Sequence, residues 1–388
     1  MSEGKIFVGD VRERLSLVAD KSVQCCVTSP PYWGLRDYGN GDQIGLEQTP
    51  EAYVAEMVAV FREIWRVMRD DGVLWLNLGD SYSGSGKGPA GNLGATHNER
   101  HLEHVHSKIV PSGLKPKDLV GIPWRVAFAL QADGWYLRQD IIWAKPNPMP
   151  ESVNDRCTKS HEYLFLLTKS PRYFFDNIAI KEKGVMTHSG SKQRDTRETH
   201  GMGGGNAGIN KAKERMKKEL AENGFVMRNK RSVWEIATKP FGGAHFAVMP
   251  EALVEPCVLS STSEHGACTE CDAPWKRKLE RGEVAERKTR DAYIGVIPGR
   301  DSATRMQSVD MEAVPYTTVG WEPTCECGVE TVKPCLVLDP FTGSGTVGVV
   351  SMRLGRDFVG TELNPDYADL AVKRIENDQP MFNHVVVV

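Results

Sequence analysis

Short, continuously apolar runs alternate along the chain with stretches of helical periodicity. The runs are rich in β-branched residues, and several end at an acid, which is typical of strands buried on both faces of a parallel sheet. They cover 4–9, 22–29, 73–80, 135–145, 161–170, 335–340 and 357–362. This alternation predicts an α/β fold with a doubly wound, mostly parallel sheet.

The clearest helix is predicted over residues 49–72. Its apolar residues recur at three- and four-residue spacing, Thr49 suits the N-cap, Pro50 suits the first turn, and Gly72 follows the last turn. A second helix is predicted over 117–134. Both lie between predicted strands, as the alternation of an α/β fold requires.

The composition indicates a folded protein without a membrane span. Of the 388 residues, 40% are hydrophobic and 26% charged, which fits one large domain with insertions or two domains. No apolar stretch approaches a membrane span, and the first residues lack a secretory signal, so a reducing cytoplasm is expected. There, the nine cysteines are expected to be thiols or metal ligands. A net charge of −3 implies that an anionic partner would meet a local basic patch.

A glycine-rich turn towards the end of the sequence indicates an adenosine-containing cofactor. Residues 335–340 predict a strand, 341–346 (FTGSGT) a tight turn that opens a helix, and 357–362 a second strand ending at Glu362. Glycines let backbone N–H groups approach a ligand, and an acid about 20 residues later can accept hydrogen bonds from a ribose diol. On this feature alone, an ordinary βα turn and a dinucleotide dehydrogenase remain alternatives.

The sequence SPPY at 29–32 directly follows an apolar strand. Proline lacks an N–H group and fixes φ, so two prolines end the strand in a rigid turn. The turn presents a serine and an aromatic ring at the end of the strand.

Read together, these two segments resemble the amino-group DNA methyltransferases. The resemblance is to the subgroup in which the catalytic motif, here SPPY at 29–32, precedes the cofactor motif, here DPFTGSGT at 339–346 followed by ELNPDY at 362–367. Residues 245–258 resemble the additional cofactor motif of the family. The resemblance covers most of the chain. It implies a Rossmann-like S-adenosylmethionine-dependent methyltransferase with permuted motif order. The loops at 81–115 and 181–232 and a cysteine-bearing insert, which is expected to bind zinc from the spacing of its cysteines, lie outside the resemblance.

The resemblance and the changes in composition together divide the chain into five segments. The expected segments are a catalytic half at 1–180, a polar flexible loop for DNA recognition at 181–232, a cofactor-associated helix segment at 233–265, a zinc-ribbon-like insert at 266–334, and a cofactor-binding half at 335–388.

The expected catalytic residues are Ser29, Pro30, Pro31 and Tyr32. An exocyclic amine is a poor nucleophile because its lone pair is delocalised into the ring of the base. Acceptors aimed at its two N–H groups favour a pyramidal nitrogen, and the Ser29 hydroxyl and the Pro30 carbonyl are the expected acceptors. Tyr32 is expected to stack on the base, which must leave the duplex. Cys25 and Cys26 are expected to be buried strand residues, because no covalent intermediate is needed.

The resemblance implies a set of residues for S-adenosylmethionine: Asp10, Phe246, Asp339, Phe341, Gly343, Ser344, Gly345, Thr346, Glu362 and Asn364. Asp10 is expected to contact the adenine, with a helix cap as the alternative, and Phe246 to pack on the cofactor or in the core. Asp80 is a candidate either to hold the flipped base or to cap a helix. His161 is expected to be structural, since this chemistry needs no histidine base.

The expected substrate is double-stranded DNA, from which the target base is flipped out of the helix. In the family, serine before Pro-Pro is associated with N4 of cytosine, so a cytosine-N4 DNA methyltransferase of a restriction-modification system is expected, with N6 of adenine as the alternative. An RNA or protein-glutamine methyltransferase and a zinc protein without activity are further alternatives. The sequence leaves open a cognate restriction endonuclease and the oligomeric state.

Four cysteines have the spacing of metal ligands. Cys268 and Cys271 form a C-x-x-C pair, and Cys325 and Cys327 form a C-x-C pair, in a segment with few apolar residues. Four thiolates suit a closed, tetrahedral, structural zinc site. The alternative is four unligated thiols in a loop. The basic stretch between the pairs is expected either to contact phosphates or to be a solvated face.

Overall fold

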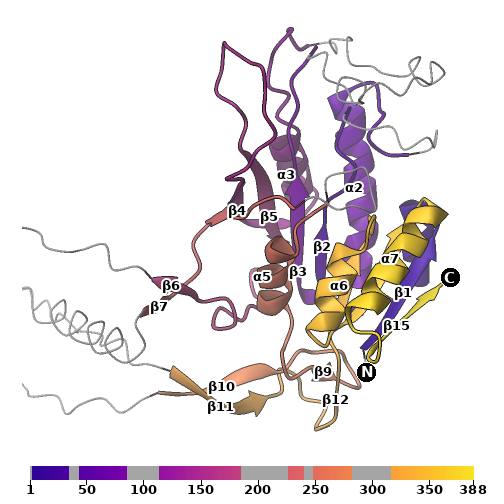
Figure 1. The fold of residues 1–388 in the computed structure, drawn as a ribbon. Helices are drawn as coiled ribbons and strands as arrows, with labels where there is room; N and C mark the ends of the chain where they lie inside the picture. Colours follow the sequence, from indigo (N-terminus) through magenta and orange to yellow (C-terminus); the bar gives the residue numbers. More distant parts are fainter. Residues whose placement is uncertain (1, 35–42, 85–112, 185–225, 240–247, 282–315) are drawn as a thin grey trace, which may run out of the picture. The chain divides into compact units, whose positions relative to one another are not determined.

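A nine-stranded sheet forms the centre of the computed structural model, which describes residues 2–34, 43–84, 113–184, 226–239, 248–281 and 316–388 (Figure 1). Its strands, in spatial order, are β15 (Asn383–Val387), β1 (Ser2–Val8), β14 (Asp357–Glu362), β13 (Leu336–Asp339), β2 (Val23–Thr28), β3 (Met68–Leu78), β5 (His161–Thr168), β4 (Tyr136–Ala144) and β8 (Val233–Glu235).

The sheet is parallel from β15 to β3, and only β5 runs antiparallel to its neighbours β3 and β4. The expected mostly parallel sheet is therefore confirmed. β13 and β14 lie between β1 and β2, although β1 and β2 follow each other in the sequence. Strand β2 is buried along its whole length, including Cys25 and Cys26, as expected for two core residues.

Helices cover both faces of the sheet and bury two apolar clusters (Figure 1). One cluster contains residues of α1 (Val11–Arg14), the 3₁₀ turn η1 (Leu15–Leu17), α2 (Pro50–Val67) and α3 (Ile122–Ala132). The other contains residues of α5 (Glu251–Ser261), α6 (Thr346–Arg353) and α7 (Pro365–Asp378). This three-layer arrangement is the doubly wound fold that the alternating pattern predicts.

Two helix boundaries differ from the expected ones. Helix α2 ends at Val67, not near Gly72, because Met68 already pairs with Val23 at the start of β3. Helix α3 begins at Ile122, since Gly121 adopts φ +77° and Pro123 follows in the first turn. Both differences arise from backbone pairing or geometry that hydrophobic periodicity does not report.

The chain divides into two compact units. The first contains Met1–Ile180, Arg231–Lys276 and Pro323–Val388, and the second contains Lys181–Lys230 and Arg277–Glu322. The first unit also holds the small pair β9 (Ala267–Cys268) and β12 (Val332–Lys333). The second unit contains the pair β6 (Glu182–Gly184) and β7 (Val226–Arg228), together with most of β10 (Lys276–Arg281), which pairs with β11 (Tyr316–Glu322). The expected five segments stay a prediction. Within the described ranges, no helix is both long and apolar enough to cross a membrane.

Candidate active site

The predicted site residues converge at one edge of the sheet. Because β1, β14, β13, β2 and β3 are parallel, their carboxyl ends lie on the same side, where α/β proteins bind ligands (Figure 1). The residues at these ends are Asp10, Glu362, Asp339, Ser29 and Asp80. A side-chain hydrogen bond joins the ends of β2 and β13, because the Thr28 hydroxyl donates to Asp339 Oδ1 at 2.9 Å.

The two carbonyl groups of the prolines in the SPPY turn differ in their hydrogen bonding. The Tyr53 hydroxyl, from α2, donates to the Pro31 carbonyl at 2.9 Å and so fixes the turn. Within the part of the chain that the structure describes, no group donates a hydrogen bond to the Pro30 carbonyl or to Ser29 Oγ. These two oxygens at the end of β2 thus accept no hydrogen bond from the described residues; Ser29 is half-buried and Pro30 is buried.

Tyr32 is anchored through its hydroxyl. This group accepts a hydrogen bond from Ser29 Oγ at 3.2 Å, and it lies 2.8 Å from Glu162 Oε2 and 3.1 Å from Asn77 Oδ1. The tyrosine ring lies against Gly79, where an added Cβ would come within 2.6 Å of it. Burial and the Glu162 carboxylate raise the pKa of Tyr32 above its ordinary value, so its hydroxyl keeps its proton.

Glu162 and Asn77 contact the Tyr32 hydroxyl, and the sequence analysis did not identify them as candidates. Glu162 forms a close ion pair with Lys145, and the Asn77 amide donates to Glu162 Oε2 at 3.3 Å and to the Tyr163 carbonyl at 3.1 Å. β5 is antiparallel to β3, so its first residues reach the edge where the parallel strands end. The available signal was a polar residue within each of two apolar runs, WLNL and HEYLF. His161 packs edge-on against Tyr163 at 5.4 Å between ring centroids.

The predicted cofactor residues at this edge include Glu362. Its carboxylate accepts hydrogen bonds from the backbone N–H of Gly343 at 2.7 Å and of Asn364 at 2.9 Å, and burial raises its pKa. Gly343 has φ +51°, and among the described residues a Cβ there would have one neighbour within 4 Å, the Phe341 carbonyl at 3.9 Å. The described part of the chain therefore leaves space beside Gly343, and contact between Gly343 and the cofactor stays a prediction.

Asp339 is buried beside this turn. It accepts from the Thr28 hydroxyl and from the backbone N–H of Phe341, at 3.1 Å. Burial raises the pKa of Asp339 to about 7, opposed by these two hydrogen bonds and assisted by the Glu362 carboxylate. Phe341 is itself partly buried against the apolar cluster beneath α2.

Three residues of the glycine turn face helix α7. Arg374 of α7 donates to Ser344 Oγ at 3.0 Å and to Thr346 Oγ1 at 2.9 Å. A Cβ at Gly345 would come within 2.8 Å of Ala371, so this glycine permits the close approach of α6 and α7. In this structure, Ser344, Gly345 and Thr346 contact helix α7. Contact between these residues and the cofactor stays a prediction.

Asp10 and Asp80 both cap helices. Asp10 is the N-cap of α1: its carboxylate accepts from the backbone N–H of Arg12 at 2.8 Å, and hydrogen bonding to the Arg12 side chain lowers its pKa. Asp80 Oδ1 accepts from the backbone N–H of Gly121 at 2.9 Å and of Ile122 at 3.0 Å, at the start of α3. The capping alternative therefore holds for both, while the adenine contact of Asp10 stays a prediction. Phe246 lies outside the described residues.

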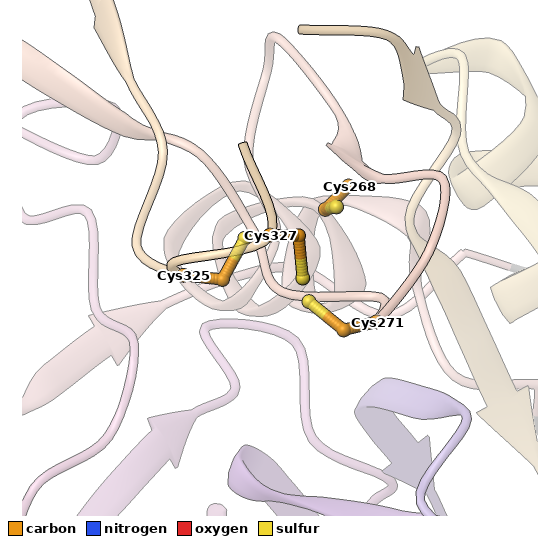
Figure 2. Close-up of side chains that lie close together, drawn as sticks. All are labelled: Cys268, Cys271, Cys325 and Cys327. Carbon is orange, nitrogen blue, oxygen red and sulfur yellow. The ribbon is translucent and has the colours of Figure 1, made fainter. Parts of the chain in front are cut away.

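Four cysteine side chains come together in a separate cluster (Figure 2). The Sγ atoms of Cys268, Cys271, Cys325 and Cys327 all lie within 4.8 Å of one another. Four sulfurs around a tetrahedral zinc, with Zn–S of about 2.3 Å, would lie about 3.8 Å apart. The Asp272 backbone N–H donates to the Cys268 carbonyl at 3.1 Å, which closes the C-x-x-C turn. The donor set and its spacing fit a zinc ion.

The cysteine cluster is tied to the amino ends of the central strands. The Gln24 side chain, near the start of β2, donates to the Asp272 carbonyl at 2.7 Å and accepts from the Leu336 N–H at 2.6 Å. Arg69, near the start of β3, donates to the Cys271 carbonyl. The cluster thus lies at the opposite end of these strands from Ser29.

A family model described as DNA methylase matches residues 23–269 and 332–373, most of the chain. The chain belongs to the DNA methylase family. The predicted family is thereby confirmed. The model of the methylase family omits 270–331, so Cys268 lies within the matched residues, and the other three cysteines of the cluster lie in the omitted segment.

Relatives within the methylase family match nearly the whole chain. The type II methyltransferase M.Cfr9I of Citrobacter freundii is 39% identical over 373 residues, which cover 96% of this chain and 88% of that protein. The type II methyltransferase M.SmaI of Serratia marcescens is 38% identical over 373 residues, covering 96% and 90%. Among solved structures, PvuII DNA methyltransferase (cytosine-N4-specific) aligns over 98% of this chain and 92% of its own, with a TM-score of 0.50 and 15% identity. This last similarity concerns the fold, which agrees with the expected methyltransferase architecture.

Proposed function

We propose that this protein is a site-specific type II DNA methyltransferase that transfers a methyl group from S-adenosylmethionine to the N4 amine of a flipped cytosine. The observation that carries the proposal is the pair of available acceptors, Ser29 Oγ and the Pro30 carbonyl, beside the open turn at Gly343. Membership of the DNA methylase family and the type II relatives support the reaction class.

The two acceptors would orient the amine. Ser29 Oγ and the Pro30 carbonyl would each accept one N–H, which favours a pyramidal nitrogen with its lone pair directed away from both. The Tyr53 hydrogen bond to the Pro31 carbonyl would keep this geometry fixed. The Tyr32 ring, held by its hydroxyl, would pack against the base once the base has left the duplex.

S-adenosylmethionine, when bound, supplies a methyl group on a sulfonium that leaves as a neutral thioether. That methyl group would pass to the lone pair of the amine that Ser29 Oγ and the Pro30 carbonyl orient, and the proton that the nitrogen loses would pass to water. Glu362 would hold the ribose diol: each oxygen already accepts one backbone N–H, and a carboxylate has further lone pairs. The open side of Gly343 would receive the cofactor.

The identity of residue 29 favours cytosine N4. Serine before Pro-Pro is associated with that target in this family, whereas aspartate is mostly associated with adenine N6. N6 of adenine is therefore the second candidate, since the same acceptors would orient an adenine amine.

We further propose that Cys268, Cys271, Cys325 and Cys327 hold one structural zinc ion. The support is the mutual proximity of their sulfurs and the cysteine-only donor set. All four positions would be filled by protein, so the ion would stabilise the fold and would take no part in methyl transfer.

The deciding experiment is methylation of a mixed-sequence DNA library with isotope-labelled S-adenosylmethionine, followed by mass spectrometry of the nucleosides. Labelled N4-methylcytosine is expected. Labelled N6-methyladenine would show that the target is adenine and would leave the proposed reaction class unchanged. Label in RNA or protein but not in DNA would overturn the proposal.

A further inference from the structure

A chain of hydrogen bonds leads from Ser29, which is proposed to orient the amine, to a partly buried ion pair. Ser29 Oγ lies 3.2 Å from the Tyr32 hydroxyl oxygen, which lies 2.8 Å from Glu162 Oε2. Glu162 in turn pairs with Lys145, and both side chains of that pair are less than one-fifth exposed. Ser29 and Tyr32 lie in the turn after β2, Glu162 lies in β5, and Lys145 directly follows the last residue of β4.

The direction of donation along this chain follows from the chemistry of its members. A tyrosine hydroxyl has one proton, and a carboxylate can only accept, so the short contact to Glu162 takes that proton. The Tyr32 oxygen is then left as an acceptor, and Ser29 must donate to it. Asn77 reinforces this arrangement, because its amide donates to the same Glu162 oxygen and to the Tyr163 carbonyl.

We propose that Glu162, acting through Tyr32, is a positioning residue that orients and polarises the Ser29 hydroxyl as an acceptor for the target amine. With its proton committed to Tyr32, Ser29 can present only lone pairs to the amine. Hydrogen bonds aligned in one direction strengthen one another, and this series ends on the Glu162 carboxylate, which is paired with Lys145. Negative polarisation is thereby directed at the nitrogen, which becomes positive as the methyl group transfers.

This inference rests on the proposed amine methylation and extends the site to residues outside the SPPY motif. The test compares single-turnover methyl transfer by the wild type, Glu162→Gln, Tyr32→Phe and the double variant. Glu162→Gln removes the negative charge. The glutamine amide can also donate to the Tyr32 oxygen, which would reverse the direction of donation along the series of hydrogen bonds. Tyr32→Phe keeps the ring and leaves the Glu162–Lys145 pair intact, so it tests the hydroxyl without disturbing the ion pair. The matched control is Glu151→Gln, because Glu151 forms a half-buried ion pair with Arg156 at 2.7 Å.

Each single variant should transfer the methyl group about tenfold to a hundredfold more slowly, the range for a hydrogen bond to a charged group. The KM for DNA and the Kd for S-adenosylmethionine should stay within about twofold of wild type, because the lost interaction acts on the transition state. The double variant should be no slower than the slower single variant, since both changes break one series. Glu151→Gln should behave as wild type.

Three results would overturn the inference: wild-type rates in both single variants, losses that multiply in the double variant, or a loss confined to KM. Absence of amine methylation by the wild type would instead refute the proposed function, so the two failures are distinguishable.

Discussion

Ser29 stands out among the polar residues at the sheet edge because, within the described chain, no group donates to its oxygen. Asp10, Asp80 and Glu362 stand at neighbouring strand ends but already accept backbone N–H groups. The Ser29 hydroxyl donates one hydrogen bond, to Tyr32, and its oxygen can still accept an N–H from a substrate. The residue type and its position were predictable from SPPY alone, whereas its availability is a property of the fold.

Replacing Ser29 with alanine should slow methyl transfer by about a hundredfold or more, the usual loss when one preorganised hydrogen-bonding group is removed from a transition state. The affinity for S-adenosylmethionine, measured by calorimetry, should not change. Ser22→Ala is the matched control, because Ser22 immediately precedes the opposite end of β2 and donates to the Ala19 carbonyl at 2.8 Å. Full activity of Ser29→Ala would remove this residue from the site.

Asp339 should make the cofactor-free protein less stable as the pH rises. Its pKa is raised to about 7 by burial, so between about pH 4 and pH 7 the folded state holds a proton that the unfolded state has released. The contribution of this group to the free energy of unfolding is therefore greatest at acidic pH and falls as the pH passes through that window. The substitution Asp339→Asn removes the titrating group but keeps a side-chain oxygen that can accept hydrogen bonds from Thr28 and from the Phe341 N–H.

Urea unfolding of wild type and Asp339→Asn at pH 4.5 and pH 8 measures this contribution. The free energy of unfolding of the variant, relative to wild type, should rise between these pH values by roughly 1–4 kcal/mol, given about 1.4 kcal/mol per unit of pKa shift. A difference that does not change with pH would show that Asp339 is ionised throughout.

At the scale of elements, local patterns predicted what is local. The β-branched runs gave the parallel strands, and their shared direction brought the predicted acids to one edge. The sequence did not reveal that Glu162 reaches the same edge, because this depends on the antiparallel register of β5 against β3. The glycines illustrate the same limit. Among the described residues, a Cβ at Gly343 would meet only the Phe341 carbonyl, while Gly345 makes room for Ala371, and a G-x-G pattern does not distinguish the two.

The pair β9 and β12 lies where the chain leaves the matched family region and where it returns, since the family model omits 270–331. Its register sets Cys268 opposite Val332. Two paired residues on each strand form too small a ladder to hold such a junction in water. A zinc ion bound to the neighbouring thiols would supply the missing stabilisation.

Purified protein should therefore contain about one zinc per chain by elemental analysis. Cys268→Ser should lose the metal and unfold at a lower temperature in calorimetry, and chelation of the wild type should do the same. Cys157→Ser is the control, because Cys157 is exposed and lies outside the cluster. Folded wild-type protein without metal would show that these thiols are not ligands.

At the scale of the whole molecule, the formal charge of −3 gives no general attraction to DNA. Binding must then depend on local groups of positive residues. Strand β10 provides one, with the exposed side chains of Lys276 and Lys278 two residues apart and hence on one face of the strand. Contact between this face and phosphates follows as a prediction.

Replacing Lys276 and Lys278 with alanine should weaken DNA binding and reduce the slope of log affinity against log salt by about 0.9 for each lost phosphate contact. Turnover at saturating DNA should be unchanged. Lys373→Ala, an exposed lysine of α7, is the control. An unchanged slope in fluorescence-anisotropy titrations would indicate that β10 is a solvated face.

The insertion of β13 and β14 between β1 and β2 has a consequence for biosynthesis. During translation, β2 emerges early with every residue destined for burial, yet its partner on one side, β13, is made about 310 residues later. Until then, one edge of an apolar strand is left open to pairing with other chains. The nascent protein therefore depends on its last strands both to protect that edge and to bring Asp339 to Thr28. The residues of the predicted site are therefore all present only once synthesis has passed β14.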